Sequence, residues 1–86
     1  MQADLQTLKR IAFAAADRSA LRSRIEDIVF DPGKDEWGSD ILRVRVRMKR
    51  LDEIDDGELV DLKRAIRDDV SDLDERFPAV RFSDAD

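Results

Sequence analysis

The sequence has no cysteine and no histidine among its 86 residues. Without cysteine, disulfides, thiolate metal sites and cysteine nucleophiles are excluded. Without histidine, the chain lacks the commonest general base near neutral pH and the commonest ligand of zinc and other transition metals. It also has no Gly-rich phosphate loop and no Gly-x-Ser-x-Gly elbow. We therefore predict that the protein is not an enzyme and that it has no catalytic, metal-binding or cofactor-binding residues and no cofactor.

Long apolar runs are missing as well, because no stretch approaches the roughly 18 residues that a membrane-spanning helix needs. The first residues lack the basic region and apolar segment of a secretion signal, so we expect a cytoplasmic protein with no membrane partner. Charged residues make up 43% of the chain and the net charge is −5. An acidic balance repels nucleic acid overall, although it leaves room for a local basic patch.

The strongest pattern that is present is the segment ILRVRVRMK at residues 41–49, in which apolar and cationic residues alternate. The apolar set is Leu42, Val44, Val46 and Met48, and the cationic set is Arg43, Arg45, Arg47 and Lys49. A period of two is what a strand needs when one face is buried and the other is wet. The pattern therefore predicts a strand over residues 41–50 with one apolar face and one cationic face.

The residues before this strand predict a helix and a first strand. Apolar residues recur three and four positions apart over residues 4–23, which favours a helix. Residues 25–31 are assigned to a strand. Residues 32–40 are assigned to a loop, because Pro32 and Gly33 suit a turn. Two strands joined by a polar loop indicate an antiparallel hairpin.

A second helix is predicted over residues 56–77. Asp55 is its expected N-cap, with Glu58 placed as in a capping box. An apolar stripe runs from Leu59 to Phe77, and Asp72 and Arg76 are spaced to pair one turn apart.

Pro78 is expected to end this helix, because proline forces the preceding residue out of helical geometry. Residues 79–83 alternate again and predict a last short strand.

These elements define one α+β domain over residues 1–86, in the order α-β-β-α-β. The second helix is long enough to return the chain as a right-handed crossover, which makes the last strand parallel to the strand at 41–50. We predict a two-layer sandwich of a three-stranded mixed sheet with both helices on one face.

The element order resembles a split β-α-β plait, the ferredoxin-like fold, without its first strand. It is similar in outline to the cytoplasmic domain of cation-diffusion metal transporters and to KH domains, which bind single-stranded nucleic acid. The transporter domains bind metal through histidine, which is absent here. KH domains carry a Gly-x-x-Gly loop where Gly57 stands alone, so no family is assigned.

The candidate interaction surface is the cationic strand face, formed by Arg43, Arg45, Arg47 and Lys49 and extended by Arg81 of the last strand. Alternate strand residues lie about 6.6 Å apart, close to the phosphate spacing of an extended single strand of nucleic acid. No aromatic residue interleaves these cations. Two alternatives stay open. The face can be a solvated surface whose cations pair with acids such as Asp27 and Asp31, or it can dock an acidic surface of a partner protein.

Trp37, the only tryptophan, lies in the predicted loop. Tryptophan is over-represented among residues that anchor interfaces. The alternative is that its ring folds back over an edge of the sheet and covers apolar surface.

The acidic residues 52–58 raise the possibility of divalent metal binding. A calcium loop needs oxygen ligands at alternate positions and a bidentate acid at the twelfth, and counting from Asp52 places Ile54 and Lys63 there instead. Helix capping explains these acids better.

The leading hypothesis from the sequence is a small protein-interaction or regulatory accessory module. We expect a homodimer, because so short a chain buries too little surface to be very stable alone. The dimer surface is expected at the edge of the first or last strand, or beside Phe13 of the first helix. The alternatives are a sheet that binds single-stranded nucleic acid and, after that, metal binding by residues 52–58.

Overall fold

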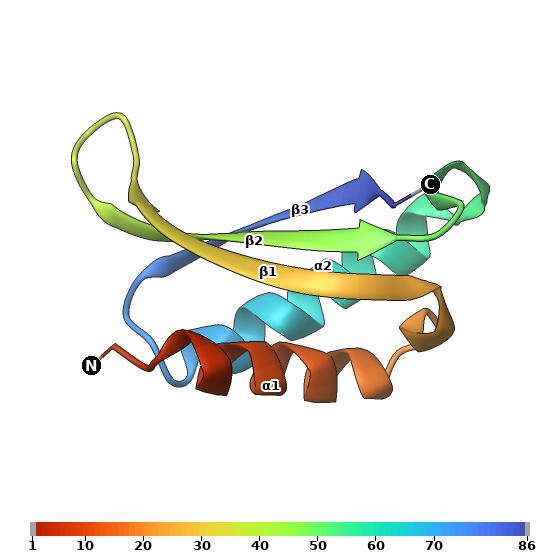
Figure 1. Cartoon of the computed structure of the whole chain (residues 1–86), viewed down its shortest axis with the longest axis horizontal. Coiled ribbons are helices and arrows are strands. Elements are labelled where there is room, and N and C mark those ends of the chain that lie inside the picture. The colour runs from red at the N-terminus through yellow and green to blue at the C-terminus, as the bar shows by residue number, and fades with distance from the viewer. Residues whose placement is uncertain (1, 86) are drawn as a thin grey trace.

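The computed structural model describes residues 2–85. The elements are α1 (Leu5–Asp17), β1 (Ile25–Lys34), β2 (Asp40–Met48), α2 (Asp56–Ser71) and β3 (Phe77–Asp84), with short 3-10 turns at Arg22–Arg24 and Leu51–Glu53. Figure 1 shows two layers, with the sheet on one side and both helices on the other. The predicted α+β two-layer sandwich is confirmed.

The sheet has the strand order β1-β2-β3, so the alternating segment lies at its centre. β1 pairs with β2 in antiparallel orientation, and β3 pairs with β2 in parallel orientation. The helix α2 makes the connection from β2 to β3, as a parallel pair requires. The predicted hairpin and the predicted parallel last strand are both present.

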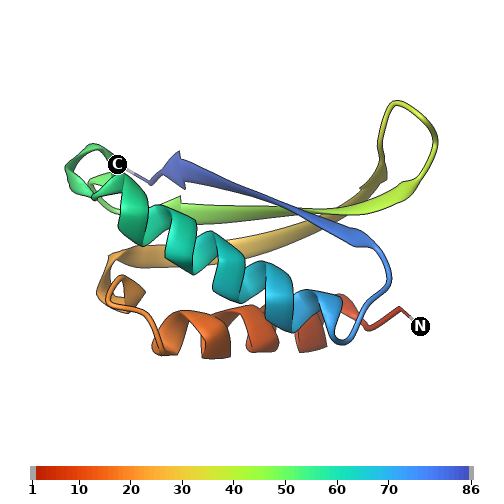
Figure 2. The same ribbon diagram turned by 180° about the vertical axis from the view of Figure 1, so that it is seen from behind.

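The apolar side of β2 forms the middle of the core. Its residues Leu42, Val44, Val46 and Met48 are each at most 1% exposed. They pack against a stripe from each helix: the buried residues are Leu8, Ala12, Ala15 and Ala16 of α1 and Leu62, Ile66 and Val70 of α2. The view from behind in Figure 2 shows the same side of the sheet covered by both helices. The opposite face is therefore left without a covering layer.

The first helix is shorter than the predicted range 4–23 and ends at Asp17. Residues 18–24 form a turn and a short 3-10 segment instead. The Ser19 hydroxyl accepts a hydrogen bond from the Leu21 N–H at 3.1 Å, and such local bonds compete with helix geometry. Leu21 is buried although it lies outside the helix, so its place in the apolar spacing reflects burial and not helical structure.

The hairpin loop is also shorter than the predicted range 32–40, because β1 continues to Lys34 and β2 begins at Asp40. Pro32 lies within β1, and Pro78 lies within β3. Both are edge strands, where proline removes no ladder hydrogen bond if its nitrogen faces outward.

The second helix ends at Ser71, not at Phe77 as predicted, and Pro78 does not end it. Leu73 and Phe77, which we assigned to the helix stripe, are 45% and 54% exposed. The predicted pair of Asp72 and Arg76 is wrong, since Arg76 pairs with Asp74.

Asp74 is the buried charge that redirects the chain here, and it is 3% exposed. Its carboxylate accepts from the Arg76 Nε at 2.9 Å, the Arg76 Nη2 at 2.7 Å, the Arg76 backbone N–H at 2.9 Å and the Ala3 N–H at 2.9 Å. The Arg76 Nη2 also donates to the Ala3 carbonyl at 3.2 Å. These bonds tie the N-terminal segment to the start of β3, and the two segments lie near each other in Figure 2.

Candidate functional site

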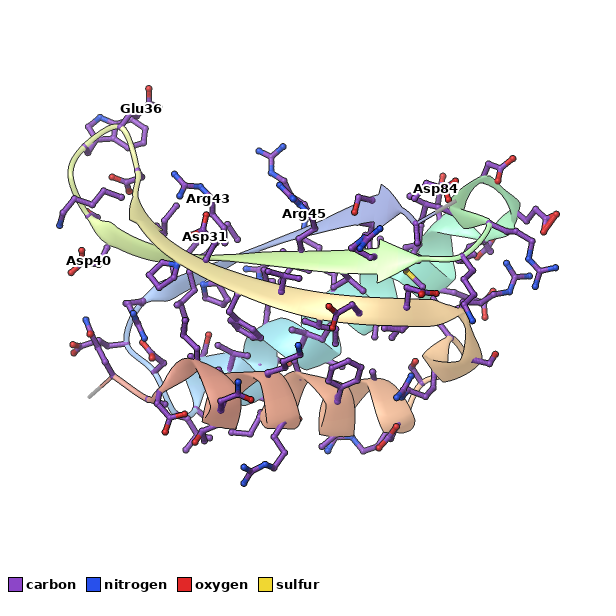
Figure 3. The ribbon with its side chains drawn as sticks, in the orientation of Figure 1. Asp31, Glu36, Asp40, Arg43, Arg45 and Asp84 are labelled. Carbon is purple, nitrogen blue, oxygen red and sulfur yellow. The ribbon has the colours of Figure 1, made fainter. Side chains whose placement is uncertain are left out.

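The uncovered face of the sheet carries the predicted cations. Arg43, Arg45 and Arg47 alternate onto it from β2 and are exposed, and Lys49, also exposed, follows β2 directly. The parallel register places Arg81 of β3 beside Arg45. In Figure 3 the side chains of Arg43 and Arg45 point away from the helices. We call these five residues the cationic face.

Two of the five cations form an ion pair with an acid on β1. The Arg43 guanidinium lies 3.9 Å from the Asp31 carboxylate, and the Lys49 ammonium lies 3.8 Å from the Glu26 carboxylate. All four side chains are about half exposed or more. Ion pairs that are this long and this exposed contribute at most about 1 kcal/mol each.

Asp27 lies opposite Arg47 in the register, but its carboxylate pairs with Lys9 of α1 at 3.2 Å. Burial raises the pKa of Asp27. Hydrogen bonds from Lys9 and the Ile28 N–H lower the pKa by more, so the net shift is downward. Asp27 is therefore occupied on the helix side, and the expected pairing of this acid with the cationic face is not what the structure shows.

The side chains of Arg45 and Arg81 form no ion pair and no hydrogen bond with any residue in the described range 2–85. They stand in one row across the sheet, on strands about 4.8 Å apart. Like charges directly opposite each other on neighbouring strands are destabilising. The free protein therefore carries a repulsion that a bound anionic group would relieve.

A shallow groove of about 310 Å³ runs over this row. Val29 of β1, which is 41% exposed, and Ala79 of β3 supply apolar surface, and Arg43, Arg45 and Arg81 surround it with guanidinium groups. A groove with this lining suits an apolar side chain flanked by carboxylates.

Trp37 does not fold back over the sheet, because it is 82% exposed. The Asp35 carboxylate accepts from the N–H groups of Trp37 and Ser39, both at 2.9 Å, and this fixes the loop at residues 35–39. In Figure 1 the hairpin tip rises away from the helices, and Figure 3 places the adjacent Glu36 at that tip. Trp37 is thus presented at one end of the uncovered face.

Of the acids at residues 52–58, Asp52 and Glu53 lie in the 3-10 turn before α2, and Asp56 and Glu58 lie in the first turn of α2. The Asp55 carboxylate caps the helix by accepting from the Gly57 N–H at 3.0 Å, not from Glu58 as a capping box would have it. Across residues 2–85 no group of three or more acidic side chains is placed to hold a metal ion.

A second groove, which was not predicted from the sequence, follows the outer edge of β3. It encloses about 400 Å³ and is lined by Lys63 and Arg67 of α2 and by Phe77–Arg81. The Arg67 guanidinium lies 5.5 Å from the centre of the Phe77 ring. Lys63 and Arg67 are four residues apart, so their shared helix face was visible in the sequence, but its position beside β3 was not.

No family model, no curated protein and no solved structure matches the chain. Within residues 2–85 we find no helix with the length and apolar character needed to cross a membrane.

The repulsion between Arg45 and Arg81 makes a prediction that needs no partner. Arg81→Glu should raise the free energy of unfolding by about 0.5 kcal/mol, because a repulsive cross-strand pair becomes an attractive one. Urea denaturation followed by circular dichroism measures this change. Arg81→Gln, which only removes the repulsion, should give a smaller gain, and a loss of stability in both variants would contradict the argument.

Proposed function

We propose that the protein is a small, non-enzymatic, cytoplasmic accessory module that docks an acidic surface of a partner protein on its cationic face. The observation that carries the proposal is the row of Arg45 and Arg81, two exposed guanidinium groups side by side with no acid to neutralise them among residues 2–85. The protein has a net charge of −5, so it contains more than enough acidic residues to neutralise these two arginines.

A protein partner explains the surroundings of this row better than nucleic acid does. Val29 offers apolar surface beside the arginines, and arginine and tryptophan are the residues that most often anchor protein interfaces. Single-strand binders stack bases on exposed aromatic rings, but the ring of Phe77 at the start of β3 already has the Arg67 guanidinium over it.

The groove also supports a binding role over a catalytic one. It is shallow and open to solvent, and catalytic groups generally need an enclosed site in which burial shifts their pKa values. Its charged residues are arginines, which stay protonated, and a single exposed aspartate.

The test is co-purification from the protein's own cells with the tagged full chain. Arg45→Glu should reduce recovery of the bound partner by about tenfold or more, because it places a repulsive charge at the centre of the contact. Arg10→Glu makes the same charge change on the exposed side of α1 and should leave recovery unchanged. Equal recovery with all three proteins would refute the proposal.

Nucleic acid remains the second candidate, because the alternate cations of β2 have the spacing of successive phosphates. Fluorescence anisotropy with labelled oligothymidylate and oligouridylate at low salt tests it. We expect weak binding with no dependence on Arg45. Tight, salt-sensitive binding that Arg45→Glu abolishes would replace the protein partner with nucleic acid.

Self-association is part of the same proposal, through the outer edge of β1. Leu5 of α1 and Val29 of β1 flank this edge and are 40% and 41% exposed. Phe13 is a weaker candidate, because the Arg22 guanidinium already covers its ring at 4.9 Å. Sedimentation equilibrium should show a dimer at high micromolar concentration that Leu5→Glu weakens. A strict monomer under these conditions would exclude it.

A further inference from the structure

The outer edge of β3 has backbone groups with no partner. The Ala85 N–H donates to the Met48 carbonyl at 2.8 Å, so residues of the same parity in β3 face β2. Because the direction of N–H and C=O groups alternates along a strand, those of Val80 and Phe82 point outward. No other described residue forms a hydrogen bond with them. Pro78 falls on the same outward set, where its missing N–H costs the sheet nothing.

Cations lie on both sides of this edge. Lys63 and Arg67 approach it from α2, and Arg81 lies on the uncovered face of β3 itself. None of the three forms an ion pair with a residue in the range 2–85. Arg67 only stacks on the Phe77 ring. The groove along β3 therefore contains backbone donors and acceptors without partners, and beside them lie the positive charges of Lys63, Arg67 and Arg81.

These features select among the possible occupants. A second copy that paired β3 with β3 would bring the two sets of cations together, which charge repulsion opposes. A nucleic-acid backbone can accept the outward N–H groups but has phosphate oxygens where the Val80 and Phe82 carbonyls need donors. An extended peptide satisfies both kinds of group, as strands added to a sheet edge do.

We propose that the β3 edge binds an extended, acidic segment of a partner protein as an added strand. Side chains on one face of that strand meet Arg81, and those on the other face meet Lys63 and Arg67. This inference rests on the proposed function and specifies how the acidic partner is recognised. Val80 is 4% exposed and Lys63 and Arg67 of α2 line the groove beside it, so the added strand would lie against these two side chains.

The test uses a synthetic probe, the capped peptide Glu-Val-Glu-Val-Glu-Val-Glu, with the full chain. NMR amide exchange should slow about tenfold or more at Val80 and Phe82 when the peptide binds, because these N–H groups gain acceptors. The amides of Ala79 and Arg81, which face β2, serve as internal controls. The double variant Lys63→Glu/Arg67→Glu should weaken binding about tenfold or more. The same peptide with lysine in place of glutamate should not bind.

The other outcomes separate this inference from the proposed function. If the peptide binds in an Arg45-dependent manner while exchange at Val80 and Phe82 is unchanged, the added strand is refuted and docking on the cationic face stands. If the peptide does not bind at millimolar concentration, the added strand is refuted, and co-purification with Arg45→Glu decides the proposed function on its own. Protection of the two amides by oligothymidylate, or by self-association without peptide, would assign the edge to that occupant instead.

Discussion

Replacing Asp74 with alanine should lower the free energy of unfolding by about 3–5 kcal/mol, because it leaves the Arg76 guanidinium nearly buried without its counter-ion. The Asp74 and Arg76 side chains are 0% and 10% exposed. The variant also leaves the Ala3 N–H and the Arg76 backbone N–H without the acceptor they share. Urea denaturation should be followed by circular dichroism, since the exposed Trp37 is a poor fluorescence reporter of unfolding.

Asp72→Ala is the matched control. Asp72 is only two residues away and is exposed, so its replacement should change stability by no more than about 0.5 kcal/mol. Arg76→Lys keeps the positive charge but removes the two parallel hydrogen bonds to Asp74. Its free energy of unfolding should lie between those of Asp72→Ala and Asp74→Ala. Equal stability of Asp72→Ala and Asp74→Ala would show that the buried pair does not hold the chain here.

The architecture could be predicted because its decisive signal is local. Alternation at residues 41–49 fixes which side of β2 is buried, since a shift by one residue would turn every side chain to the other face. The length of α2 then allows the chain to return beside β2, which sets the parallel pairing of β3. Neither inference needs knowledge of distant contacts.

The ends of the elements could not be predicted, because they depend on contacts between distant residues. The apolar stripe of α2 continues to Leu73 and Phe77 in the sequence, yet the helix ends at Ser71, and Asp74 just beyond it bonds to Ala3 and Arg76. Ala3 lies 71 residues from Asp74 along the chain, so no local pattern could reveal this contact.

Only part of the candidate site could be predicted, because some of its features follow from local patterns and others from contacts between distant residues. The side of β2 that carries its cations follows from alternation, and the topology places Arg81 on a neighbouring strand, but the register that sets Arg81 beside Arg45 was not predicted. Which cations form ion pairs depends on which acidic side chains contact them. Asp27, for example, pairs with Lys9 of α1 and not with the cationic face. The groove at β3 depends on how α2 packs against the sheet, and that is a property of the whole fold.

The buried pair also makes stability depend on pH in a defined window. Hydrogen bonds from Arg76 lower the pKa of Asp74 from 3.8 to about 2, against the opposing effect of burial. Between these two values the unfolded chain binds more protons than the folded chain, so stability rises with pH across the window. The contribution is complete above about pH 4, amounts to about 2 kcal/mol, and is lost as the pH falls through about 2.

Asp74→Asn keeps the shape of the side chain and removes its titration, which makes it the reference for this effect. Free energies of unfolding measured by urea between about pH 5 and pH 2 should fall by about 2 kcal/mol more in the wild type than in the variant. The other acids with lowered pKa values, Asp4, Asp27 and Asp40, titrate in both proteins, and their effect cancels in the difference. If the two curves run parallel down to pH 2, the Asp74 carboxylate is not held in its charged form by Arg76, and the destabilisation of the alanine variant must come from lost packing and from the lost acceptor of the Ala3 and Arg76 N–H groups.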